Sequence, residues 1–331
     1  MPRYIEEYVP LRKYSLIVGF YTMSMNLGTI CALCSAVFLP PDSDKDALAD
    51  EHVVWRCIFG FPIVLFAIQS LCFLLVVKTD GPTFFLSQGK KDLAEQAYDQ
   101  IYATHGDKSH FERMSFEFYK SRELTGSSQV SLKEAFWTNP NLSRASWVNI
   151  SVIIFHELTG INVILQYSNT ILTEILGEKE TGFNARDGTY VISLFNFLAS
   201  VVAIWTISRF GRRRLLMLGH GGMALIHFAI GIFVIIDFNA GVLIGICAFL
   251  VIYQNSSGPV AYAYASETCC DIALGMCILA LYSAILVLSL STEPLMDSPN
   301  FGTEGVFFML GVFMVIATIT VYMFVGETLG L

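Results

Sequence analysis

Long uncharged runs alternate with short polar segments along the chain. Eight runs are long enough to cross a bilayer, because about 20 helical residues span the ~30 Å hydrocarbon core. The first two occupy residues 15–39 and 57–77, and the third lies at 151–170. The other five lie near 187–208, 213–236, 240–266, 272–292 and 304–325. The pattern predicts an all-α polytopic membrane protein with about eight transmembrane helices.

The long polar segment between the second and third runs covers residues 78–145. Within it, residues 90–102 and 111–124 combine surface charge with helical periodicity, which predicts two short amphipathic helices. The segment carries nine Lys and Arg, and four more Arg lie at positions 209, 212, 213 and 214. The positive-inside rule places both basic regions on the cytoplasmic side, or its topological equivalent, with both chain ends. The acidic segment 40–51 then lies on the opposite side.

The composition agrees with a membrane protein, since 54% of the residues are hydrophobic and only 15% are charged. A soluble domain carries about a quarter charged residues. The formal net charge of −8 argues against a nucleic-acid partner. Cys31 and Cys34 form a CxxC inside an apolar run without a nearby His, so we expect small core residues rather than a metal or redox site. No cofactor is indicated, and no nucleophile–base pair suggests an enzyme.

Several polar side chains interrupt the third run. His156, Glu157, Asn162 and Gln166 lie there, although polar groups at membrane depth are costly and usually face a bundle interior or a watery cavity. Gly160 allows the helix to kink or to approach a ligand closely. One reading is a polar contact between helices, and the other, which we favour for the whole set, is a binding cavity.

The sequence LTGIN followed by QYS in this run resembles the seventh membrane helix of the sugar porters of the major facilitator superfamily. Five further segments resemble motifs of that family, in the family's order. They are PRYIEEYVP at 2–10, TDGPT at 79–83, SRFGRR at 208–213, GPVAY at 258–262 and GETLG at 326–330. The resemblance implies a major facilitator-type helix bundle that lacks the first four helices.

The resemblance also implies a domain organisation. Residues 1–77 would hold the end of helix 4 and helices 5–6 of the N-terminal half. Residues 78–145 would form a cytoplasmic helical linker domain, and residues 146–331 a complete six-helix C-terminal half. Because half of the usual bundle would be largely missing, we expect the chain by itself not to transport sugar.

The family relationship implies facilitated transport of a hexose-like or other hydroxylated solute by alternating access, with the chain incomplete alone. Facilitated diffusion is favoured over symport, because the family's acid on helix one is absent. The alternative is a transporter-derived, non-transporting structural subunit of a larger membrane assembly. The expected partners are the lipid bilayer, a small hydroxylated solute and other membrane chains that cover the missing half. The membrane would be the plasma membrane or an organelle membrane, with the mitochondrial inner membrane possible for a complex subunit.

The resemblance assigns two groups of site residues. His156 and Glu157 stand where the family has two glutamines, and Thr22 stands near its helix-five Gln. The expected substrate-binding residues are His156, Glu157, Asn162, Gln166, Tyr167, Asn196, Tyr262 and Thr22. The expected gating residues are Glu7, Arg209, Arg212, Arg213, Gly258, Pro259, Glu267 and Glu327. Glu267 has no evident local partner, because the Arg that follows it in the family is absent here.

Overall fold

The computed structural model describes residues 11–40, 46, 53–76, 80–102, 111–116, 118–119, 130–176 and 185–328, so Glu7 lies outside the described residues. Every regular element in these ranges is a helix. The chain divides into two compact units. Unit 1 is Met1, Arg3–Leu11 and Cys31–Val130, and unit 2 is Pro2, Arg12–Ile30 and Ser131–Leu331.

Unit 1 contains one apolar helix and a small helical cluster. Helix α4 (Val54–Val76) has no buried residue among those described, although its sequence is strongly apolar. Helices α5 (Pro82–Ser87) and α6 (Lys91–Tyr102) pack together, and residues 111–116 are also helical. Their core contains Leu86, Ala94, Tyr98 and Phe111. Both expected amphipathic helices of this segment are therefore present in the described residues, and α5 adds a third.

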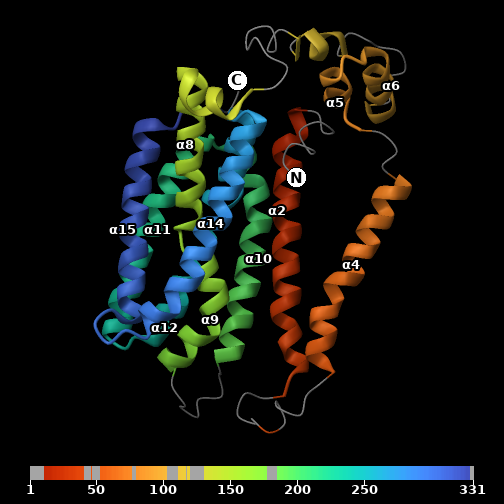
Figure 1. The fold of residues 1–331 in the computed structure, drawn as a ribbon. Helices are drawn as coiled ribbons and strands as arrows, with labels where there is room; N and C mark the ends of the chain where they lie inside the picture. The colour runs from red at the N-terminus through yellow and green to blue at the C-terminus, as the bar shows by residue number, and fades with distance from the viewer. Residues whose placement is uncertain are drawn as a thin grey trace. The chain divides into compact units, whose positions relative to one another are not determined.

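Unit 2 is a bundle of long helices, shown in Figure 1. Most of α2 belongs to it, since Arg12–Ile30 cluster with this unit. Its elements are α2 (Leu11–Cys34), η2 (Glu134–Thr138), α8 (Pro140–Glu157), α9 (Ile161–Leu176), α10 (Ala185–Arg209), α11 (Arg212–Ile235), α12 (Asn239–Gln254), α13 (Ser257–Thr268), α14 (Asp271–Met296) and α15 (Gly302–Phe324). The short helix η1 (Ser35–Phe38), which follows α2, belongs to unit 1.

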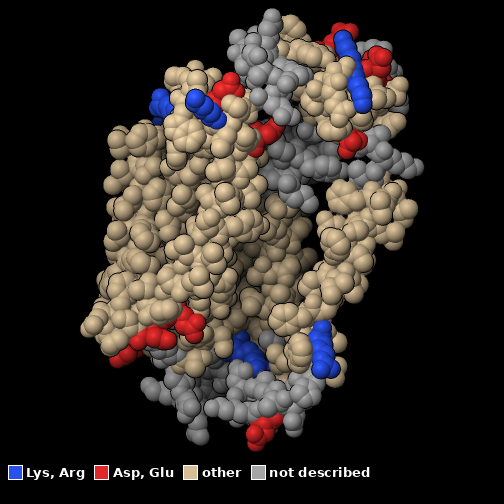
Figure 2. All heavy atoms as spheres, in the orientation of Figure 1, with Lys and Arg blue, Asp and Glu red and all other residues tan. Residues whose placement is uncertain are grey.

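Seven spans in the described residues are long and apolar enough to cross a membrane. They are Val54–Val76, Pro140–Thr173, Arg186–Ile207, Arg212–Ile235, Asn239–Thr268, Asp271–Met296 and Gly302–Phe324. The first expected run holds the 24-residue helix α2, which is not among these seven, so the count of eight stays a prediction. Figure 2 shows that the face of the unit 2 bundle turned to the viewer carries charged side chains almost only at its two ends. The molecule is an integral membrane protein with several spans.

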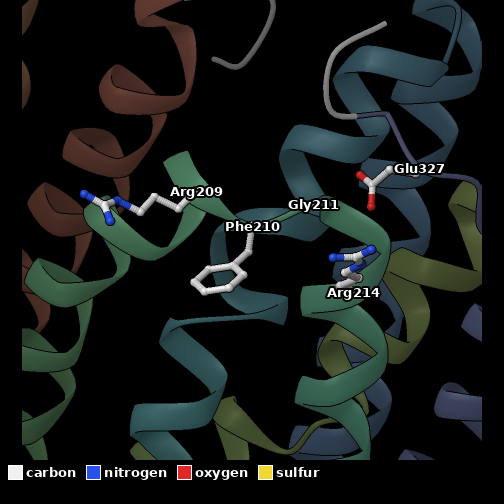
Figure 3. Close-up of a pocket in the computed structure, with 5 residues that line it drawn as sticks. All are labelled: Arg209, Phe210, Gly211, Arg214 and Glu327. Atoms are coloured by element: carbon white, nitrogen blue, oxygen red, sulfur yellow. The ribbon is translucent and has the colours of Figure 1, made fainter.

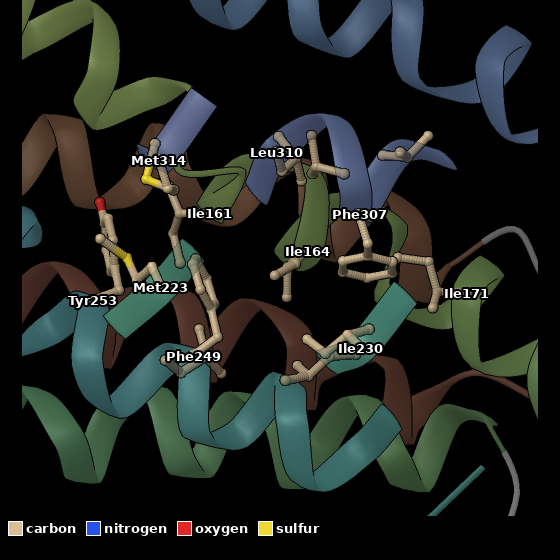
Figure 4. Close-up of a cluster of buried hydrophobic side chains, with 14 of the residues drawn as sticks. Ile161, Ile164, Ile171, Met223, Ile230, Phe249, Tyr253, Phe307, Leu310 and Met314 are labelled. Carbon is tan, nitrogen blue, oxygen red and sulfur yellow. The ribbon is translucent and has the colours of Figure 1, made fainter. Parts of the chain in front are cut away.

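The core of unit 2 surrounds helix α11, which packs most extensively against α15 and α12. Ile164, Met223, Phe249, Phe307 and Leu310 come from four different helices and are almost completely buried together (Figure 4). Lipid tails are as apolar as these side chains, so their close packing, rather than escape from water, stabilises the bundle.

Two of the spans in unit 2 are each built from two helices. The α8–α9 break ends at Gly160, whose φ of +81° lies in the left-handed region, and a Cβ there would approach Leu310 Cδ1 to 2.5 Å. The α12–α13 break lies at 255–256, and Pro259 falls in the first turn of α13. A proline is tolerated in a first turn because its missing N–H has no intrahelical acceptor there. The break in this span therefore lies just before Gly258 and Pro259, two of the expected gating residues.

The expectation that Cys31 and Cys34 are core residues is wrong. Cys31 is exposed, and Cys34 is only half-buried. An uncharged run alone does not tell which face of a helix packs inward, because lipid and core accept the same side chains.

Candidate functional site

A group of hydrogen-bonded polar side chains lies where the two helix breaks meet. His156 and Glu157 end α8 and are each 2% exposed. Nε2 of His156 lies 3.6 Å from Oε1 of Glu157, and Asn162 Nδ2 donates to Oε2 of Glu157 at 2.6 Å. Across the bundle, His156 Nδ1 lies 3.1 Å from the carbonyl oxygen of Ser257, and Nε2 lies 3.2 Å from Tyr253 Oη. We call these five residues the ionisable network.

Aromatic rings enclose the imidazole of His156. The Tyr262 ring meets it edge to face, with centroids 4.9 Å apart and an interplanar angle of 72°. The Tyr253 ring lies at 5.6 Å. Both tyrosines come from the broken span α12–α13, so this break brings two aromatic rings and the Ser257 carbonyl to the end of α8.

A second group consists of three buried amides from α2, α10 and α12. Asn196 Nδ2 donates to Asn26 Oδ1 at 2.9 Å. Gln254 Nε2 lies 2.7 Å from Asn196 Oδ1 and 3.1 Å from Asn26 Oδ1. Asn26 Nδ2 in turn donates to the backbone carbonyl oxygen of Thr22 at 3.1 Å. We call Asn26, Asn196 and Gln254 the amide network.

The two networks adjoin, because Tyr253 belongs to one and Gln254 to the other. The side-chain oxygen of Gln254 is buried without a hydrogen-bond partner among the described residues. Gly258 lies beside it, since a Cβ at this position would come within 3.3 Å of that oxygen. An unsatisfied buried amide oxygen costs about 1–3 kcal/mol, so this oxygen is available to a hydroxyl donor.

Two expected substrate-binding residues contact a different helix. Tyr167 Oη donates to the carbonyl oxygen of Ser289 on α14 at 2.8 Å, and Gln166 Oε1 accepts from Ser289 Oγ at 3.1 Å. Gln166 is exposed. Among the described residues, no hydrogen bond joins Gln166 or Tyr167 directly to the ionisable network.

The structure thus distributes the expected substrate-binding residues over three sets of contacts. His156, Glu157, Asn162 and Tyr262 come together, and Asn196 belongs to the amide network with the backbone of Thr22. That all of them line one cavity stays a prediction.

Arg209, Arg212, Arg213, Glu267 and Glu327 lie near the C-terminal ends of α10, α13 and α15 and the start of α11. Gly258 and Pro259 lie at the other end of α13. The buried Arg212 Nη2 donates to Glu267 Oε1 at 3.0 Å, so Glu267, for which the sequence showed no local partner, pairs with a residue of another helix. Glu267 Oε2 also accepts from Thr328 Oγ1 at 2.7 Å, and Glu327 Oε1 accepts from the backbone N–H of Arg212 at 2.8 Å. The partner of Glu267 comes from a residue 55 positions earlier in the chain, which a local motif does not reveal.

A surface pocket of about 200 Å³ lies beside this ion pair (Figure 3). Arg209, Phe210, Gly211, Arg214 and Glu327 line it. A Cβ at Gly211 would overlap the carboxylate of Glu327, so a larger residue there would displace this side chain. Arg209, which lines one side of the pocket, also stacks over the Trp205 ring, with its Cζ 4.5 Å from the ring centroid.

Arg213 differs from its neighbour Arg212. It donates from Nη2 to the carbonyl oxygen of Tyr322 at 2.8 Å, and its guanidinium lies 6.0 Å from the Tyr322 ring. Arg213 therefore links α11 to the end of α15 through a backbone carbonyl and an aromatic ring, and not through an ion pair.

Sequence reasoning missed four members of these networks. Asn26 lies inside the first apolar run, and Tyr253, Gln254 and Ser257 lie around the second helix break. A polar residue within an uncharged run is the signal that could have found Asn26 and Gln254, by the reasoning that selected residues 156–169. Tyr253 and Ser257 gave no such signal, because hydroxyl residues are common in membrane helices.

Comparisons with known proteins agree with this architecture. The family described as "Sugar (and other) transporter" matches residues 1–331. The D-xylose-proton symporter of Escherichia coli (strain K12) is 24% identical over 341 residues, which cover 99% of this chain and 65% of that protein. The glucose transporter GlcP of Staphylococcus epidermidis is 28% identical over 290 residues, which cover 83% of this chain and 60% of that protein.

Solved structures show the same fold. The structure of the proton:xylose symporter XylE bound to 6-bromo-6-deoxy-D-glucose superposes with a TM-score of 0.79 at 24% identity. The match covers 99% of this chain and 67% of that one.

The fold therefore defines an all-helical membrane protein of the major facilitator type. The chain belongs to the sugar transporter family of the major facilitator superfamily, a family of transporters and not of enzymes. It spans 60–65% of the length of the two relatives described above.

Proposed function

We propose that this chain, completed by a second half-bundle, carries a small hydroxylated solute of the hexose class across a membrane by alternating access. The ionisable network is the observation that supports the proposal. It places a carboxyl, an amide, an imidazole and the Tyr253 ring at the breaks of two spans, with the Tyr262 ring against the imidazole. Groups of this kind hydrogen-bond hydroxyls, and aromatic rings cover the apolar face of a sugar ring.

In this proposal Asn162 binds the solute and Tyr262 covers it. At the two helix breaks, the carbonyl oxygens of Thr159 and Ser257 lie 2.9 Å from His227 Nε2 and 3.1 Å from His156 Nδ1. Binding sites of other transporters also lie at discontinuous helices. The amide network would join α2 to α10 and α12 in one of the alternating states. The membrane would be the plasma membrane or an organelle membrane.

Solute binding tests the proposal. The purified chain in lipid nanodiscs is titrated with radiolabelled D-xylose and D-glucose, and with their L-enantiomers. We expect stereoselective binding that Asn162→Ala weakens about tenfold, because one hydrogen bond of about 1.4 kcal/mol is lost. Asn169→Ala is the matched control, since Asn169 is an exposed asparagine on the same helix. Equal binding of both enantiomers, or equal affinities of the two variants, would contradict the proposed site.

Transport is measured in proteoliposomes, with the chain alone and together with the part of the E. coli symporter that it does not match. We expect uptake only from the combination, because alternating access needs two half-bundles that move against each other. Specific binding without uptake in either preparation, together with stable copurification in a larger complex, would favour the structural-subunit alternative. In that case the mitochondrial inner membrane becomes a candidate location.

A further inference from the structure

His156 and Glu157 form a buried pair of ionisable groups that lacks a strong cation. The Glu157 carboxyl contacts Asn162 Nδ2 at 2.6 Å and His156 Nε2 at 3.6 Å. Within the described ranges no Lys or Arg forms an ion pair with it. A buried carboxylate without a cation is strongly unfavourable, and such groups usually take up a proton instead. The charge of this pair therefore depends on protons rather than on a fixed partner.

The hydrogen bonds of His156 determine which nitrogen carries a proton. Its Nδ1 lies 3.1 Å from the carbonyl oxygen of Ser257, and a carbonyl only accepts, so Nδ1 donates. In a neutral imidazole Nε2 then presents a lone pair. This lone pair faces Tyr253 Oη at 3.2 Å and Glu157 Oε1 at 3.6 Å.

Counting protons shows that this geometry calls for one more. If His156 were neutral and Glu157 ionised, a lone pair and a carboxylate oxygen would face each other in a buried site. The Tyr253 hydroxyl has a single proton, so it donates to only one of them. One added proton resolves the conflict, either on Glu157, which gives a neutral pair, or on His156 Nε2, which gives an ion pair.

We propose that Glu157 and His156 bind one exchangeable proton between them, and that its occupancy is coupled to solute binding at Asn162. The coupling rests on the proposed function, whereas the proton site itself does not. This inference replaces the facilitated diffusion expected from the sequence with proton-coupled transport, in which the coupling acid lies at the end of α8.

The titratable side chains around His156 and Glu157 carry no charge that could balance a charge on this pair. The titratable side chains that face it are Tyr253 on α12, Tyr262 on α13 and His220 on α11. Tyr21 on α2 and Tyr282 on α14 lie beyond Tyr262. Tyrosines are neutral near pH 7, and His220 is completely buried without a hydrogen-bond partner among the described residues.

Asn162 connects the proton to the solute. Its amide donates to Oε2 of Glu157, and a hydrogen bond to an ionised carboxylate is about twice as strong as one to a neutral group. When the proton lies on Glu157, its loss therefore holds the Asn162 amide more firmly and leaves it less free to bind a hydroxyl. By linkage, a solute that binds Asn162 changes the affinity of the pair for the proton by the same factor.

Infrared difference spectroscopy tests the proton site without a substrate. The full chain in lipid nanodiscs is titrated between about pH 5 and about pH 8, and the C=O band of protonated carboxylic acids is followed in H₂O and D₂O. We expect a titrating band that Glu157→Gln abolishes. Glu304→Gln, the same change at a carboxyl in the first turn of α15, is the matched control and should leave the band intact. A band that survives unchanged in Glu157→Gln would overturn the proton site.

A second variant covers the case in which Glu157→Gln does not fold. His156→Gln keeps the carboxyl but removes the group that shares its proton, so we expect the midpoint of the band to move by about one pH unit or more. An unmoved midpoint would overturn the sharing.

Adding D-xylose or D-glucose to the wild-type chain tests the coupling. We expect the midpoint to move by the logarithm of the ratio of the solute affinities at the two pH extremes. If the solute binds but the midpoint stays, the coupling is overturned while the proposed function stands. If no solute binds, the proposed function fails, and the band still decides on the proton site.

Discussion

The ionisable network and the amide network are neighbours, and yet they contain different chemistry. Both are buried in the same bundle, and they share two consecutive residues of α12: Tyr253 belongs to the ionisable network and Gln254 to the amide network. The amide network contains only neutral groups, which can make or break hydrogen bonds but do not change charge. The ionisable network contains a carboxyl and an imidazole, which can gain or lose a proton.

The difference separates two tasks that a carrier must perform. Neutral amides that link α2 to α10 and α12 hold helices together with an energy that does not depend on pH. A carboxyl and an imidazole at the α8–α9 break have two protonation states with different bonding to Asn162. Exchanging the two chemistries between the networks is therefore the most direct way to test whether each network depends on its own groups.

The largest effect is expected from a charge placed in the amide network. Asn196→Asp removes the donor to Asn26 and buries a carboxylate without a cation, which should lower the free energy of unfolding by about 3–5 kcal/mol. The measurement is denaturation in mixed detergent micelles near neutral pH. Asn169→Asp on the exposed side of α9 is the control and should change stability by less than about 0.5 kcal/mol. A loss below about 1 kcal/mol for Asn196→Asp would show that water reaches this network.

The backbone that positions the ionisable network should be nearly as sensitive. Gly160→Ala forces a left-handed conformation on a residue with a Cβ, and that Cβ would collide with Leu310. We expect a loss of about 2–4 kcal/mol from these two penalties combined. Gly275→Ala on α14, where a Cβ meets nothing within 4 Å, should be neutral or slightly stabilising in the same assay. Similar values for both variants would mean that the break adapts to a side chain.

A double-mutant cycle measures whether the amides act together. Asn196→Ala and Gln254→Ala remove the two ends of a 2.7 Å hydrogen bond, so we expect a coupling free energy of about 1–2 kcal/mol. The matched cycle pairs Asn196→Ala with Asn169→Ala on α9, and its coupling should be within about 0.5 kcal/mol of zero. Equal coupling energies in the two cycles would show that the amide network is not a unit.

The smallest effect on stability is expected from an amide in the ionisable network. Glu157→Gln keeps an oxygen that accepts from Asn162 and adds an amide that can donate to His156 Nε2, so stability should change by less than about 1 kcal/mol. The same denaturation assay measures it. A loss above about 3 kcal/mol would mean that the carboxylate is ionised and paired in the native state. The contrast with Asn196→Asp is informative because the two changes are opposite exchanges of an acid and an amide.

The sequence by itself determined the apolar framework and most of its boundaries. An uncharged run of the required length crosses a bilayer as an α-helix, because every backbone N–H and C=O group must be hydrogen-bonded within the segment. The five expected runs from 187 to 325 therefore correspond to single spans or to the broken span α12–α13. The polar residues of the third run were likewise visible in the sequence, since His156, Glu157 and Asn162 stand out against their apolar neighbours.

Only the tertiary structure decided which polar groups meet. The partners of Asn196 are Asn26, 170 positions away, and Gln254, 58 positions away, and the partner of Glu267 is Arg212 on another helix. Sequence periodicity gives the face of a helix but not its rotation against its neighbours, and in lipid no contrast in hydrophobicity distinguishes the inner face from the outer one. For that reason the exposure of Cys31, the separation of the two networks and the pairing of Glu267 all followed from packing.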